Sequence, residues 1–162
     1  MFPQVDPMEE PMAGVASRMV SVFSIASGTV HVVPFLDLSN DEWKARLTPL
    51  QYDVTRMKGT EPGFSGRYYK SFEPGIYRCV CCGTDLFDAK AKYNSGTGWP
   101  SFSAPVSPLN IRIRPDFSGR MERAEVTCIR CGSHLGHVFD DGPPPTRKRY
   151  CMNSAALVLK PL

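Results

Sequence analysis

Short apolar segments rich in β-branched residues are spaced along the second half of the chain. Residues 75–79 (GIYRC), 110–114 (NIRIR), 124–129 (AEVTCI) and 155–159 (AALVL) are separated by glycine, proline, asparagine and aspartate. Runs of this length and composition are typical of β-strands. No repeat of a size that indicates a solenoid is present. The pattern therefore predicts a mainly β domain with antiparallel sheets.

Two helix signals precede these strands. In LSNDEWKARL a serine is followed three residues later by a glutamate, which is the spacing of a capping box, so we expect a short helix over residues 40–46. Thr48 and Gln51 repeat this device around a proline at the first helical position. We expect Gly59 to end the second helix.

Residues 1–37 differ from the rest of the chain. The chain opens on the acidic MFPQVDPMEE, which lacks the apolar core of a secretory signal. Residues 12–33 are serine-rich and free of acidic residues, but Arg18 is their only arginine, which argues against a mitochondrial transit peptide. We expect an N-terminal extension over residues 1–37, poorly ordered or related to targeting, and one domain over residues 38–162.

The composition of the 162 residues is that of a globular domain, with 42% hydrophobic and 22% charged residues. The net charge of +3 is spread along the chain, so we expect no nucleic-acid partner. No apolar run approaches the roughly 18 residues that span a bilayer, so we expect no membrane partner. The cysteine spacing and the missing secretory signal favour a reducing compartment, which we take to be the cytoplasm, with the mitochondrion as the alternative.

Two C-x-x-C-G sequences, at residues 79–83 and 128–132, predict a metal site. Two residues between thiolates let one tight turn present both sulfurs to a metal, and the glycine permits a positive φ. The predicted ligands of one structural zinc ion are Cys79, Cys82, Cys128 and Cys131. Redox pairs or disulfides are the alternative interpretation of these cysteines.

Cys81 is the surplus cysteine within CVCC. Because side chains alternate along an extended backbone, we expect Cys81 to point away from a metal that its neighbours hold. Cys81 is then either a small buried hydrophobic residue or a thiol with a redox role.

Cys151 belongs to no pair and follows the basic run RKR at residues 147–149. Positive neighbours favour the thiolate, which is the nucleophilic form. If this segment is a strand, Asn153 shares a face with Cys151 and can donate to a substrate oxygen. His134 and His137 lie upstream and can supply a proton. Together these residues predict a thiol-based active site.

The stretch SGTGWPSF, residues 95–102, places Trp99 among small polar residues that are typical of a loop. Loops run over the surface, so a large indole there either anchors the loop in the core or faces a ligand.

Together these motifs resemble the type B methionine sulfoxide reductases, which reduce the R epimer at sulfur. The resemblance covers residues 39–160 and is densest over residues 76–157, where GWPSF, HLGHVFDDGP and RYCMNS occur in that order beside two C-x-x-C turns. The GCFW signature of the other reductase type is absent. The resemblance implies two small antiparallel sheets in a tent-like arrangement, N-terminal helices packed outside, and a structural zinc ion far from the active site.

The resemblance also implies a role for each candidate site residue. The family's nucleophile matches Cys151, and its methyl-recognising indole matches Trp99. Its oxygen-binding and proton-donating group matches His134, His137 and Asn153. Its orienting arginine matches Arg149, and the carboxylate partner of that arginine matches Asp141. An aromatic face takes the methyl group while polar groups take the oxygen, which distinguishes the two epimers. Phe102 and Phe139 complete the apolar wall or pack in the core.

The implied reaction starts with attack of the Cys151 thiolate on the sulfoxide sulfur, with a proton from His137 or through His134, and leaves a sulfenic acid on Cys151. Many family members carry a resolving cysteine where this chain has Thr97. We therefore expect either direct reduction by thioredoxin or another thiol, which we favour, or a substitute role for Cys81.

The sequence thus predicts a monomeric oxidoreductase that repairs methionine-R-sulfoxide, mainly in oxidised proteins. A non-catalytic zinc-binding interaction module is the alternative, but it would not explain why Cys151, Asn153 and Trp99 occur together. A zinc hydrolase with His134 or His137 as a ligand would need an open metal position, and sulfur fills all four.

Overall fold

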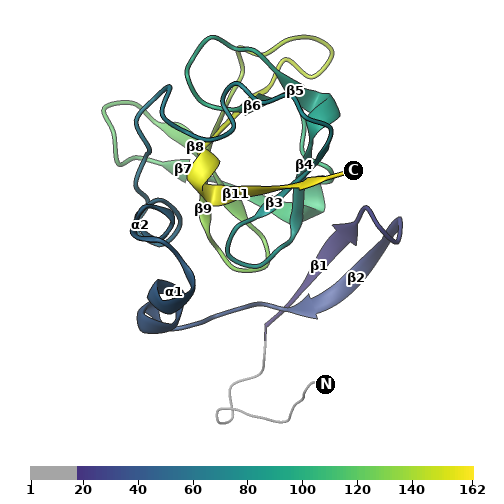
Figure 1. Ribbon diagram of the computed structural model, residues 1–162, viewed down its shortest axis with the longest axis vertical. Helices are drawn as coiled ribbons and strands as arrows, with labels where there is room; N and C mark the ends of the chain where they lie inside the picture. The colour runs from purple at the N-terminus through teal and green to yellow at the C-terminus, as the bar shows by residue number, and fades with distance from the viewer. Residues whose placement is uncertain (1–17) are drawn as a thin grey trace.

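The computed structural model describes residues 18–162, which form two antiparallel sheets, a separate hairpin and two short helices (Figure 1). The larger sheet contains, side by side, β5 (Lys92–Tyr93), β6 (Ser101–Phe102), β10 (Arg149–Met152), β9 (His134–Phe139), β8 (Arg123–Cys128) and β7 (Ile111–Asp116). The smaller sheet contains β11 (Leu157–Pro161), β3 (Gly75–Cys79) and β4 (Asp85–Asp88) in that order. The predicted mainly β fold with antiparallel sheets is confirmed.

The two sheets meet through buried aromatic side chains. Phe102 on β6 stacks on Phe87 on β4 with ring centroids 4.5 Å apart, and its ring meets Tyr77 on β3 edge-on at 5.2 Å. All three side chains are completely buried. Aromatic rings bury large apolar areas and gain further from such geometries, so this cluster holds the sheets together. Phe102 therefore packs in the core, and its assignment to the substrate wall is corrected.

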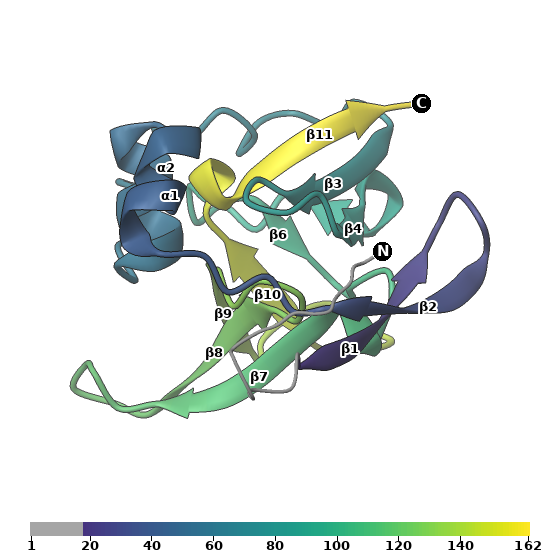
Figure 2. The ribbon, with the colours of Figure 1, turned by 90° about the horizontal axis from the view of Figure 1, so that it is seen from below.

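The helices α1 (Asn40–Arg46) and α2 (Pro49–Arg56) lie on one side of the two sheets (Figure 2). Both capping boxes are confirmed. In each box the side chain of the capping residue accepts from the backbone N–H of the third helical residue, and the side chain of that residue accepts from the backbone N–H of the capping residue. The prediction that Gly59 ends the second helix is wrong, because the helix ends at Arg56 and Lys58 adopts the positive φ. Within residues 18–162, neither helix has the length or the apolar run of a membrane span.

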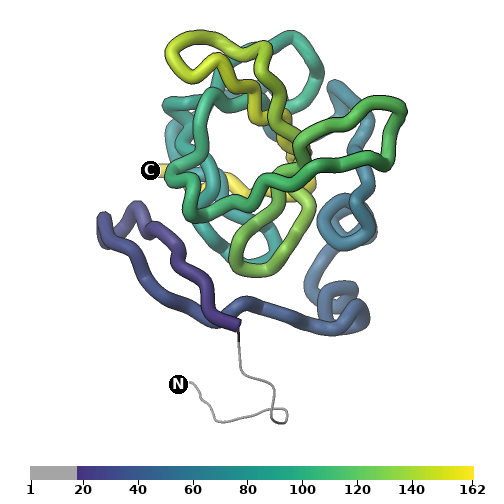
Figure 3. The backbone as a smooth tube through the Cα atoms, turned by 180° about the vertical axis from the view of Figure 1, so that it is seen from behind, coloured from purple at the N-terminus to yellow at the C-terminus, as the bar shows by residue number. Residues whose placement is uncertain are grey.

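A β-hairpin occupies part of the segment for which we expect poor order. β1 (Met19–Ser24) pairs with β2 (Thr29–Pro34), and the hairpin lies away from the helices (Figures 2 and 3). The Asn110 side chain accepts from the Phe23 N–H at 2.8 Å and donates to the Phe23 carbonyl at 2.9 Å. These bonds attach the hairpin to the domain, while residues 1–17 lie outside the described part. The domain boundary at residue 38 stays a prediction.

Candidate active site

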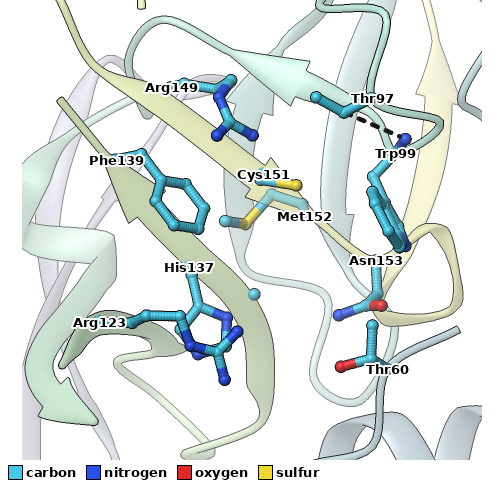
Figure 4. Close-up of a pocket in the computed structure, with 11 residues that line it drawn as sticks. Thr60, Thr97, Trp99, Arg123, His137, Phe139, Arg149, Cys151, Met152 and Asn153 are labelled. Atoms are coloured by element: carbon cyan, nitrogen blue, oxygen red, sulfur yellow. Dashed lines mark hydrogen bonds between the residues drawn. The ribbon is translucent and has the colours of Figure 1, made fainter. Parts of the chain in front are cut away.

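Cys151 lines a pocket of about 290 Å³ on one face of the larger sheet. Its strand, β10, pairs with β9 so that Cys151 lies directly opposite His137. Residues that lie opposite each other on paired strands share a face, so the thiol and the imidazole face the same pocket. Figure 4 shows Trp99 and Asn153 on one side of the thiol and Phe139 on the other. The pocket thus combines one nucleophile, two aromatic walls and several polar side chains, among them His137 and Asn153.

Burial raises the pKa of the Cys151 thiol, while the charge of Arg149 and hydrogen bonds from Thr97 and Arg149 oppose this effect. The sequence-based expectation that the whole basic run favours a thiolate is therefore corrected. Arg147 is exposed, and the exposed Lys148 pairs with Asp140. Only Arg149 of this run acts on the sulfur, and its attraction is smaller than the cost of burying a negative charge.

We predict that alkylation of Cys151 by iodoacetamide accelerates about tenfold per pH unit between pH 7 and 9, because only the thiolate reacts. Arg149→Met should slow alkylation at pH 8, since loss of the guanidinium raises the pKa further while the apolar stem is kept. Mass spectrometry of the Cys151 peptide measures both rates. A rate that is independent of pH over this range would contradict the raised pKa.

His137 is bound to a carboxylate that the sequence analysis missed. His137 Nε2 lies 2.7 Å from Asp116 Oδ2, and Arg123 Nη2 lies 3.6 Å from the same oxygen. Hydrogen bonds from His137 and Ser118 lower the pKa of Asp116, so this carboxylate is ionised at neutral pH. An ionised carboxylate only accepts hydrogen bonds, so Nε2 of His137 carries a proton and Nδ1 is left to serve a substrate.

His134 lies behind His137 and is buried with 2% of its surface exposed. The two rings meet edge-on with centroids 5.4 Å apart, and His134 Nδ1 lies 2.8 Å from Glu125 Oε2. Burial lowers the pKa of His134, although the bond to Glu125 opposes this shift. A register shift beside Val126 lets two histidines three residues apart share a face, which a regular strand would not allow. His134 is thus placed to position His137.

Asn153 follows the end of β10 and lines the pocket from the side opposite His137. Its Oδ1 accepts from the Glu61 N–H at 3.0 Å, and its Nδ2 donates to the Leu135 carbonyl at 3.1 Å. A primary amide has two N–H groups, so one of them is left to donate to a substrate oxygen. The side chain is fixed in this orientation by both bonds.

Glu61 connects Asn153 to Trp99 and was also missed by the sequence analysis. Its carbonyl accepts from Trp99 Nε1 at 3.0 Å, while its N–H holds Asn153. Its buried carboxylate accepts from the N–H groups of Ser154 and Ala155 at 2.9 and 2.8 Å. Hydrogen bonds to a charged group are each worth about 1.5–3 kcal/mol, so this residue fixes the segment directly after Asn153.

Arg149 is held by the carboxylate that the sequence analysis proposed for it. Its Nε and Nη2 lie 2.8 and 3.1 Å from the two oxygens of Asp141, and its guanidinium lies over the Phe139 ring at 4.4 Å. Asp141 itself is exposed. Arg149 and Phe139 both line the pocket, whereas Asp141 acts only through Arg149.

The four cysteines of the two C-x-x-C-G sequences converge at the C-terminal end of β8, where Cys128 lies. All four sulfurs lie within 4.8 Å of one another, with Cys79–Cys131 at 3.6 Å and Cys82–Cys128 at 3.5 Å. Tetrahedral zinc with Zn–S bonds of about 2.3 Å requires sulfurs about 3.8 Å apart. The glycines that follow each turn have φ of 79° and 72°, as predicted. The residues therefore fit a metal ion with four thiolate ligands.

The sequence belongs to a known family over this whole region. Residues 47–161 match the model of the SelR domain. The chain is a member of the SelR family. This result confirms the resemblance to the type B methionine sulfoxide reductases, because the SelR relatives of the chain carry such names.

Three SelR relatives illustrate the similarity. "Peptide methionine sulfoxide reductase B1, chloroplastic" of Arabidopsis thaliana is 51% identical over 88% of this chain and 76% of its own length. "Peptide methionine sulfoxide reductase MsrB" of Methanosarcina barkeri is 54% identical over 77% of this chain and 88% of its own length. "Methionine-R-sulfoxide reductase B3, mitochondrial" of Mus musculus is 54% identical over 76% of this chain and 49% of its own length.

Thr97, where many SelR members have a cysteine, contacts Cys151 in this chain. It lines the same pocket as Cys151, and its hydroxyl lies 2.8 Å from the Ser95 hydroxyl, which in turn lies 2.8 Å from that of Ser101. This position therefore carries a hydroxyl donor beside the reactive sulfur, in place of a second thiol.

The prediction that Cys81 points away from the cysteine cluster is wrong. β3 ends at Cys79 and the chain turns, so regular alternation stops and the Cys81 thiol interacts with those of Cys131 and Cys79. On the sheet register, Cys128 is about two strand spacings across and three residues along from Cys151, which is roughly 14 Å. Cys81 thus lies beside the metal site of this SelR protein and outside the pocket of Cys151.

Proposed function

We propose that this SelR protein reduces methionine-R-sulfoxide, mainly in oxidised proteins, to methionine, with Cys151 as the nucleophile. The observation that carries the proposal is the convergence of the Cys151 thiol, His137 and Trp99 on one pocket. A thiol, a proton donor and an aromatic wall are the groups that this reduction requires. The names of the SelR relatives support the same activity.

The pocket sorts the two groups on the sulfoxide sulfur. The methyl group lies against Trp99 and Phe139, and the oxygen accepts from the second N–H of Asn153 and from His137. With the two groups reversed, the oxygen would face the Trp99 indole, whose N–H is already bonded to Glu61, and an unpaired buried polar group costs about 1–3 kcal/mol. The pocket therefore selects one epimer, and the name "Methionine-R-sulfoxide reductase B3" of one relative supports R as that epimer.

In the reaction, Cys151 Sγ attacks the sulfoxide sulfur and the oxygen takes a proton through His137. The oxygen then passes to Cys151, methionine leaves, and the thiol has become a sulfenic acid. Ionised Asp116 accepts from Nε2 of His137 and so directs Nδ1 to the substrate, and His134 orients the ring. Arg149, held by Asp141, stabilises the thiolate at the moment of attack.

Regeneration uses an external thiol such as thioredoxin. The thiol attacks the sulfenic acid, water leaves, and a second thiol reduces the mixed disulfide. The location of Cys81 beside the cysteine cluster supports this direct route, because a disulfide requires Cα atoms within about 7 Å.

We predict that Cys81→Ser leaves the thioredoxin-supported rate of reduction within about twofold of the native rate, because the substituted thiol takes no part in regeneration. The oxidation of NADPH by thioredoxin reductase measures this rate. Dithiothreitol-supported turnover is the control for folding. Loss of the thioredoxin-supported rate alone would establish Cys81 as the resolving thiol.

The four-cysteine cluster holds a structural zinc ion in this proposal. The four thiolates leave no position for water, so the ion supports the fold and takes no part in the reaction. The non-catalytic zinc module is not favoured, because it gives no reason for the thiol pocket. We further propose a monomer in the cytoplasm, although two of the SelR relatives named above carry chloroplastic and mitochondrial names.

The proposed activity is tested with racemic N-acetyl-methionine sulfoxide and dithiothreitol. Chiral chromatography follows both epimers, and we expect only the R epimer to disappear. Consumption of neither epimer by a folded protein would reject the proposal and favour the zinc module. Equal consumption of both would reject the assignment of Trp99 and Asn153.

A further inference from the structure

A second hollow, lined by aromatic side chains, shares Trp99 with the pocket of Cys151. We call it the aromatic groove. It has a volume of about 680 Å³ and is lined by Phe64, Tyr69, Lys70, Phe72, Tyr93, Asn94, Ser95, Gly96, Gly98 and Trp99. Phe64 and Phe72 are 62% and 52% exposed. Exposed apolar side chains that gather beside a reactive site are typical of a binding surface.

The two exposed phenylalanines are held in place by their neighbours. The Phe64 N–H donates to the Gly98 carbonyl at 2.8 Å, and the Phe64 ring meets Tyr69 edge-on at 5.6 Å. The Phe72 ring lies 4.1 Å from the buried ammonium of Lys92. Rings that are fixed before binding lose little entropy when a ligand arrives, so the groove is preorganised.

Tyr93 lines this groove, and its hydroxyl lies buried beneath the surface. Its hydroxyl is buried and has no hydrogen-bond partner among residues 18–162. Burial raises the pKa of Tyr93, so the phenol stays neutral and can donate a hydrogen bond. The groove therefore offers a bound polypeptide the aromatic ring of Tyr93, and the hydroxyl stays covered.

The sheet register sets the distance between Tyr93 and the reactive sulfur. Tyr93 on β5 lies opposite Ser101 on β6, which lies opposite Cys151 on β10. Two strand spacings correspond to about 10 Å, and the three side chains share a face. An extended polypeptide covers about 10 Å in three residues. A chain whose sulfoxide reaches Cys151 can therefore place its third neighbouring residue at the groove.

We propose that the aromatic groove binds the oxidised polypeptide itself, with an apolar or aromatic side chain about three residues from the methionine sulfoxide packed between Phe64 and Phe72. This inference rests on the proposed function and specifies its substrate class. Lys70 is the only charged residue among the described residues that line the groove, so acidic neighbours are tolerated and basic ones are disfavoured.

The test compares three substrates, each with dithiothreitol and, separately, with thioredoxin as reductant. Two are alanine-based peptides with one central methionine-R-sulfoxide, and one of them carries phenylalanine at the third residue on each side. The third is N-acetyl-methionine-R-sulfoxide amide, which is too small to reach the groove. We expect the phenylalanine peptide to have a kcat/KM about tenfold higher than the alanine peptide, mainly through KM.

Phe64→Ala and Phe72→Ala should each remove most of this advantage and leave reduction of the small substrate intact. Phe117→Ala is the matched control, because Phe117 is 72% exposed but lies in the loop between β7 and β8, outside the groove. Phe117→Ala should keep the advantage of the phenylalanine peptide.

Four results would overturn the proposal. The first is an equal kcat/KM for the two peptides in the native protein, and the second is an equal fall in kcat/KM for all three substrates in Phe72→Ala. The third is loss of the phenylalanine peptide's advantage in Phe117→Ala. The fourth is a fall in rate that is confined to thioredoxin-supported turnover, which would assign the groove to the reductant. If none of the three substrates is reduced, the proposed function fails, and this inference fails with it.

Discussion

Replacement of Cys151 by serine is expected to lower the rate of methionine-R-sulfoxide reduction by at least about a thousandfold. A serine hydroxyl is not ionised at neutral pH and cannot become a sulfenic acid, so both the attack and the transfer of oxygen are lost. Serine differs from cysteine by one atom in a half-buried position, so the fold should be kept. Chiral chromatography of the remaining epimers measures the effect.

Thermal unfolding of Cys151→Ser provides its control, since an unchanged Tm with no turnover separates chemistry from folding. Dimedone, which labels sulfenic acids, should mark the native protein after one turnover without reductant and should not mark the variant. Turnover by Cys151→Ser at a rate near that of the native protein would remove the thiol mechanism altogether.

Replacement of Cys128 by serine should destabilise the whole domain by at least about 4 kcal/mol, which lowers Tm by more than about 10 °C. Cys128 is 1% exposed and contributes one of the four thiolates at the end of β8. Because metal binding at a structural site is coupled to folding, loss of one ligand weakens the connection between the two sheets. Calorimetry measures the stability and elemental analysis measures the zinc content.

Cys81→Ser is the matched variant for this experiment, because Cys81 touches the same cluster without being one of its four ligands. It should keep one zinc ion per chain and a Tm close to that of the native protein. A Cys128→Ser protein that is stable, active and free of zinc would refute a structural role for the metal.

The features that were predicted correctly depend on short stretches of sequence. Both helices follow from capping boxes within four residues, and the metal site follows from the C-x-x-C-G spacing. The alternating MVSVFS and TVHVVP, separated by a turn with Gly28, contained the signal for the N-terminal hairpin. Its attachment depends on Asn110 and Asp85, which lie 87 and 60 residues away from their hairpin partners, so the sequence alone did not reveal it.

The site residues that were missed are single acidic residues in ordinary contexts. Asp116 and Glu125 reach the histidines only through the pairing of β7, β8 and β9 and a register shift that no sequence motif marks. Glu61 lies in a loop of glycine and proline, where a buried carboxylate is not expected. The raised pKa of Cys151 has the same origin, because burial is a property of the fold and the basic run is a property of the sequence.

The two hydrogen bonds that the Glu61 backbone makes set the distance between two side chains of the pocket, Asn153 and Trp99. The N–H that fixes Asn153 and the carbonyl that fixes Trp99 belong to one residue, so ordinary bond lengths and angles set their separation. The Asn153 amide and the Trp99 indole therefore keep their separation as long as both bonds hold. A shift of the loop around Glu61 would disturb both side chains at once, whereas His137 and Phe139 on β9 would keep their positions beside Cys151.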